Sequence, residues 1–193
     1  MPETRTYTVY KFHELSEDIQ KKAIEKLWDI NVSHDWWDFV YADAENIGLK
    51  ITSFDTSYRE EITGDFILNA DDCARKILKE HGKLEAQEEE TGTRKIASEF
   101  LEELSCLREK LSGLEREYDK VEHTDHDLAD SLYDKIKDTE EEVETLEKEF
   151  KNDLLREYLS ILRKELDYLL SEESIIETIE ANDYDFRENG SID

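Results

Sequence analysis

The sequence predicts an α+β protein in which a small sheet with packed helices carries a long antiparallel coiled-coil helical hairpin. Three observations predict this class: short alternating segments within residues 1–82, apolar residues at heptad spacing within 94–172, and a return to alternation within 173–193. Although 40% of the residues are charged, the 3 Trp, 9 Tyr and 7 Phe and the strict periodicity argue against disorder.

Residues 1–82 have the pattern of an α+β domain with the element order β-α-α-β-β-α. Ser16 and Ser33 precede amphipathic runs and are expected to cap two helices, because a serine hydroxyl accepts from the free N–H groups of a first turn. Asn69 is expected to cap a third helix, and Gly64 is a candidate β-bulge. The three strands are expected at residues 7–12, 49–53 and 58–68.

Residues 83–93 have little hydrophobic pattern and are expected to form a linker to a helical hairpin at 94–172. The polar run HTDHD separates two heptad segments, and a short polar connection favours an antiparallel pair. After Phe150 the leucines continue in a shifted phase, which predicts that the second helix leaves the hairpin there. The apolar positions of the hairpin run from Ala97 to Val121 and from Ala129 to Phe150.

Residues 173–193 are expected to return to the α+β domain. Ser174 precedes a short apolar helix, and Tyr184 and Phe186 then alternate with acids as in a strand. The Asn-Gly pair at 189–190 is a turn signal. The sequence therefore predicts that the two ends of the chain meet on one small sheet.

The formal net charge of −27, from 52 acidic and 25 basic residues, disfavours direct binding to nucleic acid or to an anionic membrane. We expect no membrane span, because no apolar run approaches about 18 residues. The first residues contain no apolar core of a signal peptide, so we expect a cytoplasmic protein. Cys73 and Cys106 lie in helical patterns and are expected to be reduced thiols.

Two segments carry a resemblance: TVYKFHELSEDIQKKAIEKLWDINVSHDWWDFVYADAENIGLKITSFD at residues 8–55 and IIETIEANDYDFRENGSI at 175–192. They resemble the opening and closing segments of a widespread family of phage and prophage proteins. Some gut-phage proteins of similar size and acidic character look like anti-CRISPR inhibitors of Cas9-type nucleases, and this chain is similar to them. The resemblance implies a phage-encoded inhibitor that binds a CRISPR effector nuclease with its guide RNA in the bacterial host. It brings no catalytic or binding motif with it.

The sequence contains no glycine-rich phosphate loop, no G-x-S-x-G elbow and no Cys–His pair at a recognisable spacing. His123 and His126, with Asp125 and Asp127, form the one metal-like cluster. We interpret it as a solvated loop that separates two helices. We therefore expect no catalytic residues, no metal and no cofactor.

Two groups of residues are candidates for binding a partner. In the first, Trp36 and Trp37 precede Asp38; adjacent residues on a helix point about 100° apart. One tryptophan is then a surface anchor and the other a core residue, unless both pack inside. The second group consists of two acidic runs, which are either solvated faces or charges that mimic nucleic acid: Glu88, Glu89, Glu90, Glu140, Glu141 and Glu142.

The stretch 83–172 holds 28 acidic and 14 basic residues, so a hairpin about 60 Å long carries a net charge only about every 4 Å. DNA carries one about every 1.7 Å, so steering toward a basic host protein is a safer inference than mimicry.

The alternative is a coiled-coil structural or regulatory protein, antitoxin-like or a homodimer, whose hairpins pair into a four-helix bundle. Full burial within one chain of four seam residues would argue against this alternative: Leu104, Leu111, Ile136 and Val143.

Overall fold

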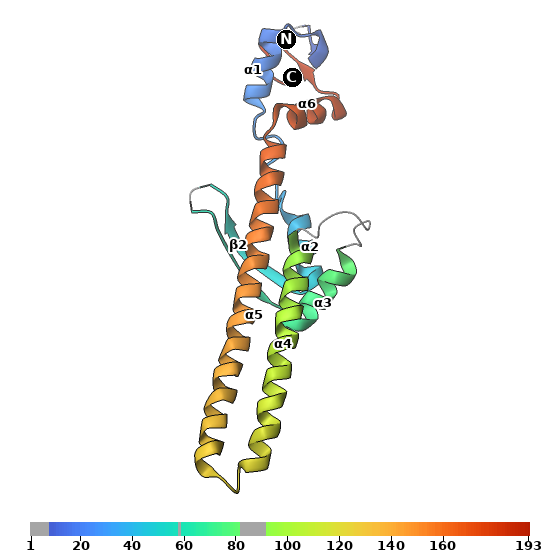
Figure 1. Ribbon diagram of the computed structural model, residues 1–193. Helices are drawn as coiled ribbons and strands as arrows, with labels where there is room; N and C mark the ends of the chain where they lie inside the picture. The colour runs from blue at the N-terminus through green and yellow to red at the C-terminus, as the bar shows by residue number, and fades with distance from the viewer. Residues whose placement is uncertain (1–7, 58, 82–91) are drawn as a thin grey trace, which may run out of the picture. The chain divides into compact units, whose positions relative to one another are not determined.

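The structure is a computed structural model that describes residues 8–57, 59–81 and 92–193. It confirms the predicted class: an α+β protein with short antiparallel strands and a long pair of helices (Figure 1). The chain divides into two compact units, one that joins residues up to Phe39 with Leu162–Asp193, and one that comprises Val40–Ile161. This division differs from the predicted ranges, because residues 40–81 group with the hairpin.

The first unit is built from both ends of the chain. Strand β1 (Tyr10–Lys11) pairs antiparallel with β4 (Asp185–Phe186), so the predicted meeting of the two ends is present in the structure. A 3-10 turn (Phe12–Glu14), helix α1 (Glu17–Lys26) and helix α6 (Glu172–Ala181) complete this unit. Its core consists of Phe12, Leu15, Ala23, Ile175, Ile179 and Phe186.

One buried amide connects three segments of the first unit. Asn31, which is 7% exposed, donates from Nδ2 to the carbonyl oxygen of Leu169 at 3.1 Å and to Ser174 Oγ at 3.0 Å. Its Oδ1 accepts from Thr178 Oγ1 at 2.7 Å.

The N-cap of α6 is Ser171, whose hydroxyl accepts from the N–H of Ser174, so the predicted start at Ser174 is three residues late.

The second unit places a β-hairpin and two helices beside the helical hairpin (Figure 1). Strands β2 (Leu49–Asp55) and β3 (Glu61–Phe66) pair with each other and not with β1, so the protein has two two-stranded sheets instead of one among its described residues. The register shifts between Ile51 and Ser53, so the bulged residue is Thr52 and not the predicted Gly64. The helices of this part are α2 (Asp38–Ile47) and α3 (Ala70–Glu80), the latter capped by Asn69 as predicted.

Gly64 is still required where it lies. A Cβ atom there would come within 2.5 Å of the carbonyl oxygen of Lys50 and 2.9 Å of a Leu155 methyl group. The absence of a side chain therefore lets the β-hairpin lie against the part of helix α5 (His126–Leu169) that contains Leu155.

The predicted helix start at Ser33 is wrong. The Ser33 hydroxyl donates to the carbonyl oxygen of Ile30 at 3.3 Å instead of capping a helix. The N–H of Trp36 bonds the His34 carbonyl at 2.8 Å, which holds residues 34–37 in turns, and α2 begins only at Asp38. Because α2 begins five residues after Ser33, the Ser33 hydroxyl is not at the N-cap position of this helix.

The helical hairpin has the predicted form. Helix α4 (Gly92–Val121) and helix α5 (His126–Leu169) are joined by a short turn within the run HTDHD. Residues 92 and 93 of the predicted linker already belong to α4, and residues 82–91 lie outside the described part of the chain. The last two turns of α5, from Leu162, group with the first unit, and residues 151–161 group with the hairpin, so this boundary lies later than the departure predicted after Phe150. No helix in the described ranges is long and apolar enough to cross a membrane.

The two cysteines are expected to react at very different rates with a thiol reagent. Both are free; Cys106 is exposed, whereas burial raises the pKa of Cys73 to about 12. We expect one equivalent of label to react rapidly at pH 8 in the native protein and a second only in urea. Mass spectrometry with peptide mapping checks this, and rapid native labelling of Cys73 would contradict the packing of α3.

Candidate functional site: an acidic groove on the helical hairpin

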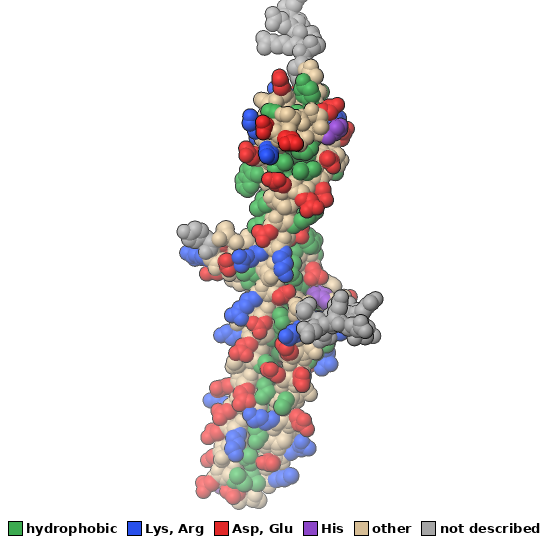
Figure 2. Space-filling model, turned by 45° about the horizontal axis from the view of Figure 1, so that its top comes forward, with side chains coloured by type: hydrophobic (Ala, Val, Ile, Leu, Met, Phe, Trp, Pro, Cys, Tyr) green, Lys and Arg blue, Asp and Glu red, His purple; other side chains and the backbone are tan. Residues whose placement is uncertain are grey.

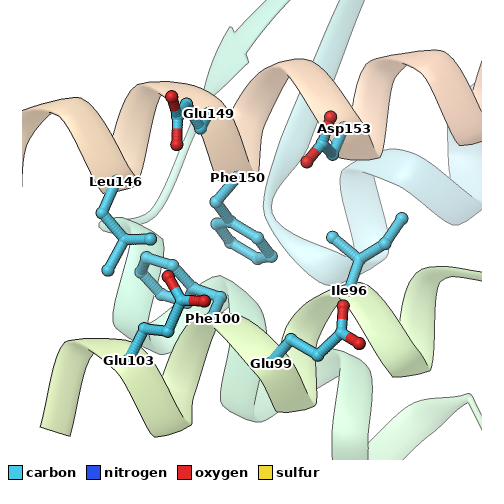
Figure 3. A pocket seen from close by; sticks show the side chains of 8 residues that line it. All are labelled: Ile96, Glu99, Phe100, Glu103, Leu146, Glu149, Phe150 and Asp153. Carbon is cyan, nitrogen blue, oxygen red and sulfur yellow. The ribbon is translucent and has the colours of Figure 1, made fainter. Parts of the chain in front are cut away.

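A groove between α4 and α5 combines an apolar floor with carboxylates on both sides (Figure 3). Its volume is about 170 Å³. The rings of Phe100 and Phe150 point toward each other between the helices, and the carboxylates lie along the two edges (Figure 3). The lining residues are Ile96, Glu99, Phe100, Glu103, Leu146, Glu149, Phe150 and Asp153.

Three stacked aromatic rings support the floor of the groove. The centroids of the Phe100 and Phe150 rings are 4.1 Å apart with planes at 10°, and Phe66 of β3 stacks on Phe150 at 5.7 Å. Phe100 and Phe150 are each 3% exposed. The stack fixes the spacing of the two helices at this point, because close-packed rings in a core leave little free volume.

The groove continues along the hairpin into a second hollow of about 450 Å³. The two hollows share Glu103, Leu146 and Glu149, so they form one continuous surface. We call this surface the acidic groove. Its rim carries seven carboxylates: Glu99, Glu103, Asp138, Glu141, Glu142, Glu149 and Asp153.

The heptad register explains why carboxylates face each other across the groove. The a positions of the heptads include Leu104 and Leu111 on α4 and Val143 and Phe150 on α5. In an antiparallel pair of helices, the residues directly before the a positions lie on the same side of the apolar seam between the helices, and oppositely charged residues usually face each other there. Lys110 and Glu142 do so, with Nζ and Oε2 2.8 Å apart. One heptad closer to the β-hairpin, the same register places Glu103 opposite Glu149, so two like charges flank the aromatic floor.

Basic side chains neutralise only part of the rim. Besides the Lys110–Glu142 pair, three cations approach rim carboxylates: Arg156 to Asp153 at 2.9 Å, Lys95 to Glu99 at 3.7 Å and Lys137 to Glu141 at 3.9 Å. Within the described residues, Glu103, Asp138 and Glu149 have no ion pair. Acidic and basic side chains also intermingle over the visible face of the hairpin (Figure 2). Within the rim, the uncompensated charge therefore lies at Glu103, Asp138 and Glu149.

The structure separates the residues predicted to bind a partner. Glu140, Glu141 and Glu142 are exposed, and the last two line the groove while Glu140 does not. Glu88, Glu89 and Glu90 lie outside the described residues.

The tryptophan pair belongs to the first unit, and the hairpin acids belong to the second. Trp36 and Trp37 are both half-buried and pack edge to face, with ring centroids 5.6 Å apart, and Asp38 is exposed. Trp28, which the sequence analysis does not single out, is the tryptophan with the large exposed fraction, at 58%.

Four rim residues were not predicted as binding residues: Glu99, Glu103, Glu149 and Asp153. A signal for them is present, because each directly precedes a buried residue of the seam: Phe100, Leu104, Phe150 and Leu154. Assigning each charged residue to its heptad position would have identified these like-charged residues. Counting acidic residues along the sequence instead points to runs such as 140–142.

Asp125 of the His123 cluster has a structural role. The Asp125 carboxylate accepts from the N–H of Leu128 at 3.1 Å and so caps α5, and the His123 imidazole is 3.7 Å from Glu122 at an exposed position. Across residues 8–57, 59–81 and 92–193, no three His, Cys, Asp or Glu side chains are close enough to hold a metal ion.

A polar network inside the second unit also has a structural role. Tyr158, which is 1% exposed, donates to Asp43 Oδ2 at 2.7 Å, and burial raises the pKa of its hydroxyl. His81 Nδ1 lies 2.7 Å from Thr93 Oγ1, and its Nε2 lies 3.5 Å from Asp43 Oδ1. These contacts hold α2, α3, α4 and α5 together.

Comparison of the chain with family models, with curated proteins and with solved structures finds no match. A function for this chain therefore rests on the chemistry of its own residues, and the acidic groove combines a hollow, an apolar floor and uncompensated charge.

Proposed function

We propose that the protein is a non-catalytic binder of a basic protein surface and that the acidic groove is its contact. The observation that carries this proposal is the position of Glu103 opposite Glu149 above an aromatic floor. Like charges that face each other lower the stability of a coiled coil, whereas a cation from a partner would bring both carboxylates favourable interactions. The arrangement costs stability in the free protein and suits a complex.

We propose further that the partner is a nuclease of host defence, of the Cas9 class with its guide RNA, and that binding inhibits it in the cytoplasm of the bacterial host. Such effectors hold nucleic acid in positively charged channels. A protein with a net charge of −27 is steered toward a channel of this kind, and the groove offers specific carboxylates at its surface.

Reversing one rim charge is expected to separate binding from folding. In Glu103→Lys the new ammonium group faces Glu149, so the hairpin should gain about 0.3–1 kcal/mol of stability. Affinity for the effector should nevertheless fall roughly tenfold, because a cation now occupies the contact. Pull-down with effector and guide RNA, a DNA cleavage assay and urea unfolding measure the three effects.

The matched control is Glu102→Lys, an equal change of charge on the outward face of α4 that does not line the groove. It should reduce affinity only slightly, through the net charge. An equal loss of affinity for the effector in Glu102→Lys and Glu103→Lys would show that the groove is not the contact. Absence of binding and of inhibition across several Cas9-type effectors with the wild-type protein would overturn the proposed function. Affinity should also fall steeply with ionic strength.

A second candidate function, self-association, is supported by the apolar contact line between α4 and α5 toward the turn that joins them. Leu104 is 1% exposed, but Leu111, Ile136 and Val143 are only half-buried, so one chain does not close its own seam. Pairing of two hairpins into a four-helix bundle would cover these residues. Light scattering tests this, and a monomer at high protein concentration would count against it.

A further inference from the structure

We infer that the acidic groove receives one basic amphipathic α-helix, which lies along α4 and α5 and presents an apolar stripe to the floor. The inference rests on the proposed function and adds the secondary structure and the side-chain pattern of the element that binds. It concerns the second unit alone, since every lining residue lies within Val40–Ile161.

The dimensions of the groove suit a helix. On α5 the lining residues run from Asp138 to Asp153, a length of about 22 Å at the rise of an α-helix, or about four turns. Half-buried Ile96, Leu107 and Leu146 add exposed apolar surface to the phenylalanine floor. A third helix would bury this surface by ridges-into-grooves packing.

Backbone chemistry argues against an extended peptide as the occupant. A strand binds by sharing main-chain hydrogen bonds with an unpaired sheet edge. The backbone groups of α4 and α5 along the groove are committed to their own helices, so an extended segment would find no partners for its N–H and C=O groups. A helix satisfies these groups internally and requires only side-chain contacts.

Charge selects a basic helix over a second copy of this chain. The stretch 83–172 carries 28 acidic and 14 basic residues, so a second hairpin would bring more carboxylates to the rim. Lys or Arg at spacings of three and four on both flanks of a partner helix would instead reach Glu103, Glu149 and Asp138. Arginine suits these positions best, because its fork can bind two carboxylate oxygens at once.

The test uses the full-length protein and synthetic peptides of about 15 residues. The probe has leucines at helical spacing flanked by arginines. One control peptide has the same composition in an order without an amphipathic face, and another has glutamate in place of arginine. Fluorescence anisotropy should show binding of the probe alone, and circular dichroism should show helix forming as it binds. Equal binding of the scrambled peptide would overturn the inference.

Variants of the protein then locate the site. Glu103→Lys and Leu107→Gln should each weaken probe binding roughly tenfold, and Leu107→Gln leaves the charge unchanged. The matched controls are Glu102→Lys and Leu128→Gln; Leu128 is 44% exposed on α5 and lies outside the groove. If the control variants and the groove variants lose the same affinity for the probe, or if the probe does not bind the wild-type protein, a helix in this groove is ruled out.

The two proposals can fail separately. Inhibition of a Cas9-type effector that survives Glu103→Lys and Leu107→Gln would leave the proposed function standing and remove the groove. Binding of the probe helix without binding to any effector would leave the helix-binding groove standing and remove the proposed target.

Discussion

Phe150→Ala is expected to lower the free energy of unfolding of the second unit by about 3–5 kcal/mol. The ring is 3% exposed and stacks on Phe100 at 4.1 Å and on Phe66 at 5.7 Å, so its removal leaves a cavity where α4, α5 and β3 meet. The free-energy cost includes this cavity because the surrounding helices relax only partially into the space. Far-UV circular dichroism in urea measures the change.

Tyr133→Ala is the matched control for this substitution. It removes an aromatic side chain from the same helix, but Tyr133 is 58% exposed. The control should change stability by no more than about 0.5 kcal/mol. A loss below about 1 kcal/mol for Phe150→Ala would show that the aromatic stack does not support the groove. The native thiol of Cys73, in the same unit, gives a second readout, because faster labelling accompanies local opening.

Asn31→Asp is expected to destabilise the first unit by about 3–5 kcal/mol, although the two side chains have the same shape. The carboxylate loses both hydrogen bonds that the Asn31 amide donates, and it places a charge beside the carbonyl oxygen of Leu169. The site is 7% exposed, so water cannot compensate. Intrinsic fluorescence in urea reports this unit, because Trp28, Trp36 and Trp37 all belong to it.

The control makes the same substitution at an exposed position. Asn152 lies on the surface of α5 in the second unit, and Asn152→Asp should change stability by no more than about 0.5 kcal/mol. A midpoint of the fluorescence transition that does not move in Asn31→Asp would contradict the bonding pattern of this amide. Since Phe150 and Asn31 lie in different units, comparison of the two variants also shows whether the units unfold together.

The hairpin was predictable because its signal is local and repeated. Spacings of three and four from Ala97 to Val121 and from Ala129 to Phe150 leave few alternatives to two long helices, and a polar turn between them sets their direction. Pairing of the chain's ends followed from alternation around Tyr184 and Phe186.

The features that could not be predicted depend on contacts between segments that are distant in the sequence. Nothing near Gly64 in the sequence indicates that Leu155 lies against it, so the membership of the β-hairpin in the second unit was not predictable. The start of α2 was missed because the residues after Ser33 form turns, with the N–H groups of Trp36 and Asp38 bonded to the carbonyl oxygens of His34 and Asp35, so the helix begins only at Asp38. The groove itself was not predicted: the sequence indicated an acidic hairpin, whereas the facing positions of Glu103 and Glu149 follow from the register between α4 and α5.

The way in which the first unit is assembled affects its synthesis. Translation proceeds from the N-terminus, so the contiguous segment Val40–Ile161 leaves the ribosome before the residues that complete the first unit. Phe12 and Leu15 remain uncovered until Ile175, Ile179 and Phe186 have been synthesised, at least 160 residues later. A nascent chain that stalls before Ile175 thus leaves Phe12 and Leu15 without the residues that cover them in the native core.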